Sequence, residues 1–299
     1  MNHACRLVLL TALVVISIPP ASAQILSHTI FTDQNLDISG IVTVFHSPER
    51  TVFLTVHDSK FSWQKRVGVI TIDNDTLVHS DELDWPAGFE KLTDIECIAR
   101  CPGDTSFIMM TSRGRGLHFR INQDYTGIEG ISEFDLPLPK EMDPQIEGFA
   151  IFNAFNTVYA FWGDRGKDRR PATVWWGTID MDTYTITVED STLISVPWPD
   201  KGEVRHLSEM RIDSAGGLWI TSVRDGGNHG PFDSAMYMAG FFHPSEGHQL
   251  RFTIEQSLIP ILRIPAHKVE AFDFVPGHPG GIVFGTDDEK FGSILIKNW

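Results

Sequence analysis

One short pattern occurs five times along the chain and constrains the fold more than any other feature. In each copy an aliphatic residue is followed by Ser or Glu, then any residue, then a large apolar residue. The copies read Ile38-Ser39-Gly40-Ile41, Ile95-Glu96-Cys97-Ile98, Ile146-Glu147-Gly148-Phe149, Leu207-Ser208-Glu209-Met210 and Val269-Glu270-Ala271-Phe272. Successive copies are 51 to 62 residues apart. Self-similarity at a period near 50 residues is typical of a β-propeller, in which each repeat is one blade.

Each interval between copies contains runs of β-branched, aromatic and aliphatic residues, separated by Gly, Pro, Asp and Asn, which predict β-strands. The first four repeats have four such runs each, the size of one blade. These runs are residues 38–45, 51–56, 67–72 and 76–83; 95–99, 106–111, 117–121 and 131–136; 146–152, 157–162, 173–179 and 185–196; and 207–212, 218–223, 235–242 and 250–254. No helix of normal length is expected.

The fifth repeat is one strand short, with runs only at residues 269–275, 281–285 and 293–296. Residues 25–32, before the first copy, form a further strand-like run, and pairing it into the last blade would close the ring. We therefore predict an all-β fold, a five-bladed β-propeller whose N-terminal strand closes the last blade. A six-bladed ring would require one interval of about 60 residues to hold two blades, which is too short for eight strands.

The first 23 residues have the pattern of a signal peptide. Arg6 precedes an apolar run at residues 7–18, and Ala21-Ser22-Ala23 forms a cleavage signal. The run is too short for a good membrane span, so an uncleaved anchor is the less favoured alternative. We expect residues 24–299 to form a single propeller domain, secreted or periplasmic, with no membrane span.

The charge of the chain limits its partners. The formal net charge of −15 disfavours nucleic acid, whose phosphates require a basic surface, but it tolerates a divalent cation. Cys97 and Cys101 are the only cysteines after the signal peptide. Export would permit a disulfide between them, yet their short separation makes the geometry poor, so the bridge stays open at this point.

The variable motif position holds Ser39, Glu96, Glu147, Ser208 and Glu270 in chain order. The first strand of each blade is innermost in a propeller, so these side chains are expected to converge on the central axis. Like charges in a poorly solvated space require compensation, either by shared protons or by a cation. Ser and Glu offer only hard oxygen ligands, which suit Ca²⁺ better than zinc or copper. The alternative is that these side chains bond neighbouring backbone amides and hold no ion.

The order Ser, Glu, Glu, Ser, Glu resembles the calcium ligands of the calcium-activated nucleotidases, or apyrases, which are five-bladed propellers. Leu207-Ser208-Glu209 and Lys268-Val269-Glu270-Ala271-Phe272 are also similar to that family. The resemblance implies a central Ca²⁺ bound by Ser39, Glu96, Glu147, Ser208 and Glu270. Ile38-Ser39-Gly40-Ile41 and Ile146-Glu147-Gly148-Phe149 are also similar to exported esterase-like phytase and SdiA-regulated propellers.

The loops after the second strand of each blade are expected to open where the innermost strands begin. Each carries a basic residue in an otherwise acidic protein. The residues are Lys60, Arg113 and Arg115, Arg165, Arg224, and Lys290. Arginine clamps phosphoryl oxygens, so the loops predict a small phosphorylated molecule as ligand, although loops are also charged simply because they are solvated.

Two functions follow from these expectations. One is Ca²⁺-dependent hydrolysis of a nucleotide phosphoanhydride or a phosphate ester, with Asp58 and Arg113 as catalytic residues and Lys60, Arg115, Arg165, Arg224 and Lys290 binding the substrate. The other is a non-catalytic propeller that binds an unknown ligand or a protein partner around a structural Ca²⁺. The first loop reads His57-Asp58-Ser59-Lys60 where the nucleotidases have Asp-Asp-Arg-Thr-Gly. It lacks one acid and replaces Arg by Lys, which favours the second function.

Overall fold

The computed structural model describes residues 26–31, 37–245, 249–277 and 280–298. The predicted signal peptide, residues 1–23, lies outside these residues. Within them the chain is almost entirely β-structure, and its one helical turn is the 3₁₀ segment Glu289–Phe291. No helix in this part of the chain has the length and apolarity needed to cross a membrane.

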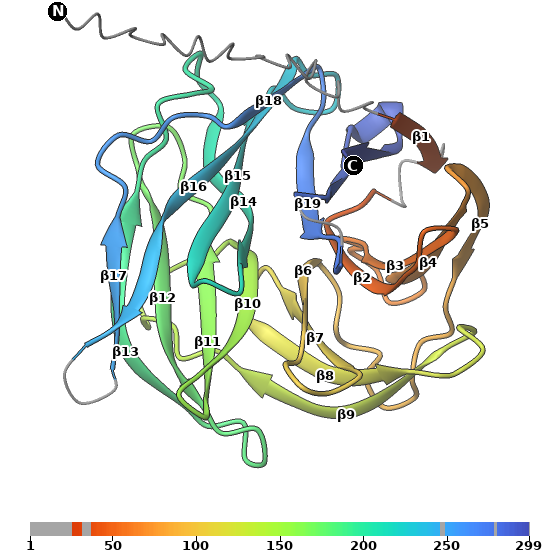
Figure 1. The fold of residues 1–299 in the computed structure, drawn as a ribbon, viewed down its shortest axis with the longest axis horizontal. Helices are drawn as coiled ribbons and strands as arrows, with labels where there is room; N and C mark the ends of the chain where they lie inside the picture. Colours follow the sequence, from red (N-terminus) through yellow and green to blue (C-terminus); the bar gives the residue numbers. More distant parts are fainter. Residues whose placement is uncertain (1–25, 32–36, 246–248, 278–279, 299) are drawn as a thin grey trace, which may run out of the picture.

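The strands form five antiparallel sheets arranged around a common axis, which confirms the predicted five-bladed propeller (Figure 1). Blade 1 contains β2 (Gly40–His46), β3 (Arg50–Val56), β4 (Val67–Asp73) and β5 (Thr76–Glu82). Blade 2 contains β6 (Ile95–Arg100), β7 (Ser106–Thr111), β8 (Arg115–Ile121) and β9 (Ile128–Asp135). Blade 3 contains β10 (Ile146–Ala154), β11 (Thr157–Asp164), β12 (Ala172–Ile179) and β13 (Ile186–Ile194).

Blade 4 contains β14 (Val204–Ile212), β15 (Gly217–Asp225), β16 (Phe232–Pro244) and β17 (Leu250–Ile254), and β18 (Leu262–Pro265) also pairs with it. The strand β18 was not predicted. It is possible because β16 is long: β17 pairs with its C-terminal half and β18 with residues 233–236.

Blade 5 is completed from both ends of the described chain, as predicted. It contains β19 (Val269–Phe274), β20 (Ile282–Thr286) and β21 (Ser293–Asn298), and β1 (Leu26–Phe31) pairs antiparallel with β21. Leu26 pairs with Lys297 and Thr29 with Ile294. The pairing gives β21 a neighbour on its outer edge and closes the ring.

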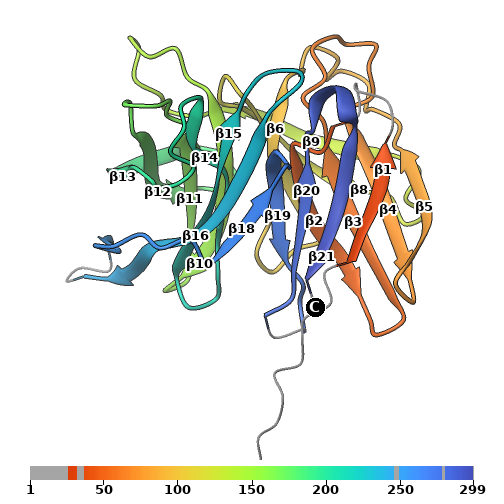
Figure 2. The ribbon, with the colours of Figure 1, turned by 90° about the horizontal axis from the view of Figure 1, so that it is seen from above.

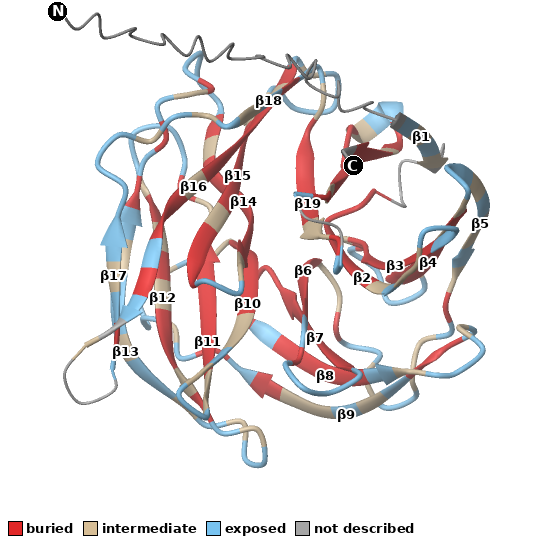
Figure 3. Ribbon diagram, in the orientation of Figure 1, coloured by how far each residue is buried: buried red, intermediate tan, exposed pale blue. Residues whose placement is uncertain are grey.

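The core is divided into five clusters of buried apolar residues, one between each pair of neighbouring blades. Between blades 5 and 1, for example, Ile38, Phe53 and Ile70 pack against Val283 and Leu295. Figure 3 shows the burial concentrated on the strands near the axis, with the outer strands more exposed. Blade-to-blade packing, which burial of apolar surface stabilises, therefore holds the ring together.

The innermost strands β2, β6, β10, β14 and β19 follow one another around the axis (Figures 1 and 2). In four of the five blades a small residue follows the variable motif position, which allows a close approach; the residues are Gly40, Cys97, Gly148 and Ala271. A Cβ atom on Gly148 would lie 2.7 Å from Cγ of Met210 in the next blade. Cys97 and Cys101 are buried and free in the structure, so no disulfide joins them.

Candidate functional site

Three of the five variable motif residues lie at a β-bulge in the innermost strand of their blade. Glu96, Glu147 and Glu270 each fall at a one-residue break in the pairing of the first two strands of their blade. Such a β-bulge leaves one residue unpaired and re-aims its side chain. All three carboxylates are buried, with at most 8% of each residue exposed, and all three line one cavity on the axis.

The axial cavity has a volume of about 470 Å³ and an almost wholly polar lining. It is lined by Asp58, Lys60, Asp94, Glu96, Arg113, Gln145, Glu147, Arg165, Arg205, Lys268, Glu270, Asp287 and Glu289. The innermost strands supply the bulged glutamates, and the loops after the second strands supply Asp58, Lys60, Arg113, Arg165, Asp287 and Glu289. The expectation that these loops open where the innermost strands begin is therefore met in four of the five blades.

The two serines of the motif do not line the cavity. Ser208 donates its hydroxyl hydrogen within the interface of blades 4 and 5, where Oγ lies 2.8 Å from the carbonyl oxygen of Val269 and 3.1 Å from Oγ1 of Thr221. Ser39 is buried, and its Oγ has no hydrogen-bond partner in the described structure. The glutamates of the motif therefore line the cavity, whereas its two serines lie outside the cavity lining.

Two cations that the sequence analysis did not assign, the partly buried Arg205 and the buried Lys268, lie beside the glutamates. Arg205 lies 2.6 Å from Oε1 of Glu270 and 3.7 Å from Oε1 of Glu147, and it also bonds Asp225. Lys268 lies 3.3 Å from Oε1 of Glu270. The protein itself therefore places positive charge beside the buried glutamates. Burial still raises the pKa of Glu270 well above its usual value, although Lys268 and Arg205 oppose the shift.

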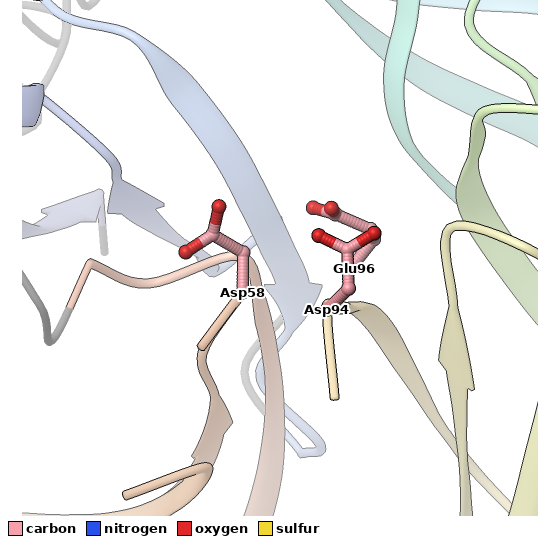
Figure 4. Close-up of side chains that lie close together, drawn as sticks. All are labelled: Asp58, Asp94 and Glu96. Atoms are coloured by element: carbon pink, nitrogen blue, oxygen red, sulfur yellow. The ribbon is translucent and has the colours of Figure 1, made fainter. Parts of the chain in front are cut away.

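Opposite Arg205, three carboxylates from blades 1 and 2 form a cluster. Asp58, Asp94 and Glu96 each offer an oxygen within 4.8 Å of the others, and Figure 4 shows Asp58 facing Asp94 and Glu96. The ammonium of Lys60 lies 2.8 Å from Asp58 and 3.9 Å from Glu96, and it donates a hydrogen bond to Asp94. The cluster thus has one cation for three acidic groups.

The environments of Asp94 and Glu96 shift the pKa values of the two carboxyl groups in opposite directions. Burial raises the pKa of Glu96 well above its usual value, and the negative charges of Glu147 and Asp58 add to the effect. Burial opposes the shift at Asp94, but hydrogen bonds from Lys60 and Ser112 hold its pKa below the usual value. Glu96 therefore keeps its proton to higher pH than Asp94 does.

A second pair of acids, Asp37 and Asp287, lies close to Glu270. Burial and the neighbouring Asp287 raise the pKa of Asp37 to about 10. Although burial opposes it, Lys268 lowers the pKa of Asp287 to about 2. The two carboxyl groups therefore share one proton, with Asp37 as donor.

The predicted substrate-binding residues separate into two groups. Lys60 and Arg165 line the cavity, with Arg165 3.0 Å from Glu147, and Arg113, which was predicted as a catalytic residue, lines its mouth beside Asp143. The other three basic residues do not line it: Arg115 pairs with Glu133, Arg224 lies 3.7 Å from Asp233, and Lys290 lies 3.4 Å from His229. The loops thus direct each basic residue either into the cavity or away from it, and the spacing of the residues in the sequence does not predict which.

The chemistry of the cluster fits a hard cation. Asp58, Asp94 and Glu96 provide three carboxylate oxygens in one place, which is the ligand type that Ca²⁺ takes. Glu147 and Glu270 instead contact Arg205, and the two serines lie outside the cavity lining. The five-residue Ca²⁺ ring stays a prediction, and the geometry favours the carboxylate cluster as the place for the ion.

Comparisons with known proteins bear on the fold alone. No protein-family model matches the chain, and a search of curated proteins found no match. Among solved structures, the chain is similar to an endo-arabinase from Bacteroides thetaiotaomicron, with a TM-score of 0.52, 7% identity, and coverage of 91% of this chain and 96% of the other. It is also similar to a thermostable family-43 glycoside hydrolase, with a TM-score of 0.50, 12% identity, and coverage of 87% and 88%. These likenesses support a propeller and give no support to the predicted nucleotidase identity.

Proposed function

We propose that the protein is a hydrolase whose active site is the axial cavity, and that it cleaves a small phosphorylated molecule with Ca²⁺ at Asp58, Asp94 and Glu96. One observation supports this most strongly. A cluster of three carboxylates and three guanidinium groups, from Arg113, Arg165 and Arg205, faces the same 470 Å³ cavity. Phosphoryl transfer requires this combination, because negative charge must be both positioned and neutralised.

The roles follow from exposure and contacts. Arg165 and Arg205 are partly buried and braced by Glu147, so they are positioned to clamp phosphoryl oxygens. Arg113 is exposed at the mouth and stabilises the charge that develops on the substrate. Asp58 is the most exposed acid of the cluster and orients the attacking water. A bound Ca²⁺ would neutralise charge on the phosphoryl group.

The experiment measures phosphate release from nucleotides, phytate and simple esters, with Ca²⁺ or with a chelator. We expect Ca²⁺-dependent release that falls about 100-fold or more in Asp94→Asn and Arg113→Ala, because each removes charge stabilisation. Asp124→Asn and Arg120→Ala are matched controls, since both residues lie outside the cavity lining, and Arg120, like Arg113, is an exposed arginine beside an aspartate. Release that ignores Ca²⁺ and both cavity substitutions would contradict the mechanism.

A second candidate is hydrolysis of a glycosidic bond. The observation that favours it is the opposite shift at Asp94 and Glu96, because glycosidases use one ionised and one protonated carboxyl group beside the scissile bond. The solved structures named above include glycoside hydrolases. Release of nitrophenol from aryl arabinosides and xylosides, lost in Glu96→Gln, would select this reaction over phosphate release.

The non-catalytic alternative has its own signature in the same assays. A propeller that only binds a ligand would turn over neither phosphorylated compounds nor glycosides. It would still bind an anionic compound from the panel, with affinity lost in Arg165→Ala and kept in Arg120→Ala. That result would replace the hydrolase proposal with a binding module.

A further inference from the structure

A second cavity, of about 550 Å³, lies between blades 4 and 5 beside the axial cavity. Its walls are mainly apolar and come from the start of β16, the end of β18, the 3₁₀ turn and β21. The apolar residues are Pro231, Phe232, Pro265, Ala266, Phe291 and Ile294. Phe291 is 66% exposed, which leaves the cavity open to a ligand from solvent. A cavity of this size with apolar walls is typical of small-molecule sites.

The two cavities share one wall, in which successive residues alternate between the two sides. Lys268, Asp287 and Glu289 line the axial cavity, whereas His267 and Asp288 line the second cavity. The wall is held together by hydrogen bonds: the backbone N–H of Lys268 donates to Oδ1 of Asp288 at 2.7 Å, and the N–H of Asp287 donates to the carbonyl of Lys268 at 2.9 Å. The second cavity therefore has a rigid polar end.

That polar end is built around His267. Its Nδ1–H donates to Oδ2 of Asp288 at 2.7 Å, and its side chain is 30% exposed. The hydrogen bond from His267 to Asp288 raises the pKa of the imidazole, although burial opposes the shift, so it keeps its proton to higher pH than usual. Lys290 lies at the rim, 3.4 Å from His229.

The remaining charges near this end are already paired. Asp288 is buried and accepts hydrogen bonds from His267, Lys268 and the hydroxyl of Thr286. Asp233, the other acid of the lining, lies 3.7 Å from the guanidinium of Arg224. Among the described residues, the cationic groups at this end are thus the imidazole of His267, one nitrogen of which bonds Asp288, and the rim ammonium of Lys290. Both can donate a hydrogen bond to an anion.

We propose that this cavity is a second binding site, for a small amphipathic acid with an apolar or aromatic body and one anionic group. The body packs against Phe232, Pro265 and Phe291, and the anionic group contacts His267 and Lys290. The proposal does not rest on the chemistry of the axial cavity. A binding measurement therefore tests it independently of any turnover.

The test uses a fluorescent probe of the proposed chemistry, 8-anilinonaphthalene-1-sulfonate, followed by displacement with 4-phenylbutyrate and with its neutral amide. We expect saturable binding of one probe per chain. The carboxylate should displace it at about tenfold lower concentration than the amide, which corresponds to about 1.4 kcal/mol. No saturable binding, or equal displacement by acid and amide, would overturn the proposal.

Two substitutions locate the site. Phe291→Ala should weaken probe binding about tenfold, and because the ring is exposed the fold should be kept, as thermal melting will show. His267→Gln can keep a hydrogen bond to Asp288 but loses one of the two cationic groups, so it should clearly reduce the advantage of the acid over the amide. Phe241→Ala and His243→Gln, on the far half of β16, are the matched controls and should leave binding unchanged. Binding that both cavity variants keep would place the probe elsewhere and refute the assignment.

Discussion

His118 lies at the interface of blades 2 and 3, where both nitrogens of its ring have partners. Nε2 lies 2.8 Å from Oγ of Ser106, and Nδ1 lies 2.7 Å from the hydroxyl oxygen of Tyr184. The residue is only 6% exposed, and burial lowers the pKa of its imidazole below the usual value. In the folded state this histidine therefore stays neutral to lower pH than an ordinary histidine does.

This pKa shift has a definite sign in the stability of the protein. Because the folded pKa lies below the unfolded value of about 6.5, the stabilisation is present above that value and is lost as the pH falls through the folded pKa. His118→Gln removes the titration, so the wild type should exceed the variant by about 1–3 kcal/mol at pH 8, and the difference should shrink towards pH 5. Urea unfolding at pH 5, 6, 7 and 8 measures it, with His243→Gln as control. A difference that is constant with pH would contradict this account.

At the level of single residues, the sequence predicted where a residue falls along its strand better than it predicted where its side chain points. The five motif copies correctly placed Glu96, Glu147 and Glu270 at the cavity, because a repeat fixes where each residue falls along its strand. Their bulges, and the turn of Ser208 into the blade interface, depend on local pairing that no pattern encodes. Arg205 was missed because it stands three residues before Ser208 and outside the motif. The signal that finds it is physical: buried carboxylates require buried cations.

The strand β1 is attached to the propeller along one edge, by its pairing with β21, and on one face, by apolar packing. Its only pairing partner among the described strands is β21, and Ile30 packs against the cluster between blades 5 and 1. Its neighbour Thr29 is exposed on the opposite face. This alternation explains why the segment could be recognised as a strand before its partner was known.

Placing a charge on the inner face of β1 should open the ring. Ile30→Asp brings a carboxylate against apolar residues and should lower the free energy of unfolding by about 2–3 kcal/mol. Thr29→Asp changes the exposed face of the same strand and should alter it by no more than about 0.5 kcal/mol. Urea denaturation followed by tryptophan fluorescence compares the two. Equal losses in both variants would mean that β1 does not close the blade by its inner face.

Elements beyond the repeat were harder to predict than those within it. The strand β18 lies between the fourth and fifth copies, and its pairing became possible only because β16 extends from Phe232 to Pro244. The sequence run at residues 235–242 did not reveal that length. Where a strand ends depends on the strands that pair with it, and the sequence of the strand itself does not show these.

For the whole molecule, the question is whether the axial cavity depends on a metal ion. If Ca²⁺ binds only the folded state, at 100 times its Kd it should stabilise the protein by about 2.7 kcal/mol. Thermal melting with Ca²⁺ and with a chelator measures this, and Asp94→Asn should abolish the shift. Because Lys60 contacts the same three carboxylates, Lys60→Gln should enlarge it, whereas Lys91→Gln should not. If Ca²⁺ changes the melting temperature of neither the wild type nor any variant, the cavity holds no stabilising ion, and the protein's own cations compensate its carboxylates.

The pairing of Leu26 with Lys297 joins residues at opposite ends of the described chain. A ribosome makes β1 before any other described strand and β21 last, so the first strand must wait for nearly the whole chain. The entropy of closing so long a loop grows only slowly with length, by about 0.6 kcal/mol per doubling, and the finished ring bears it easily. We expect the long separation to affect the rate of folding more than the stability of the folded protein. Four blades can assemble from neighbouring hairpins, whereas the fifth requires segments from distant parts of the chain, so we expect it to form last.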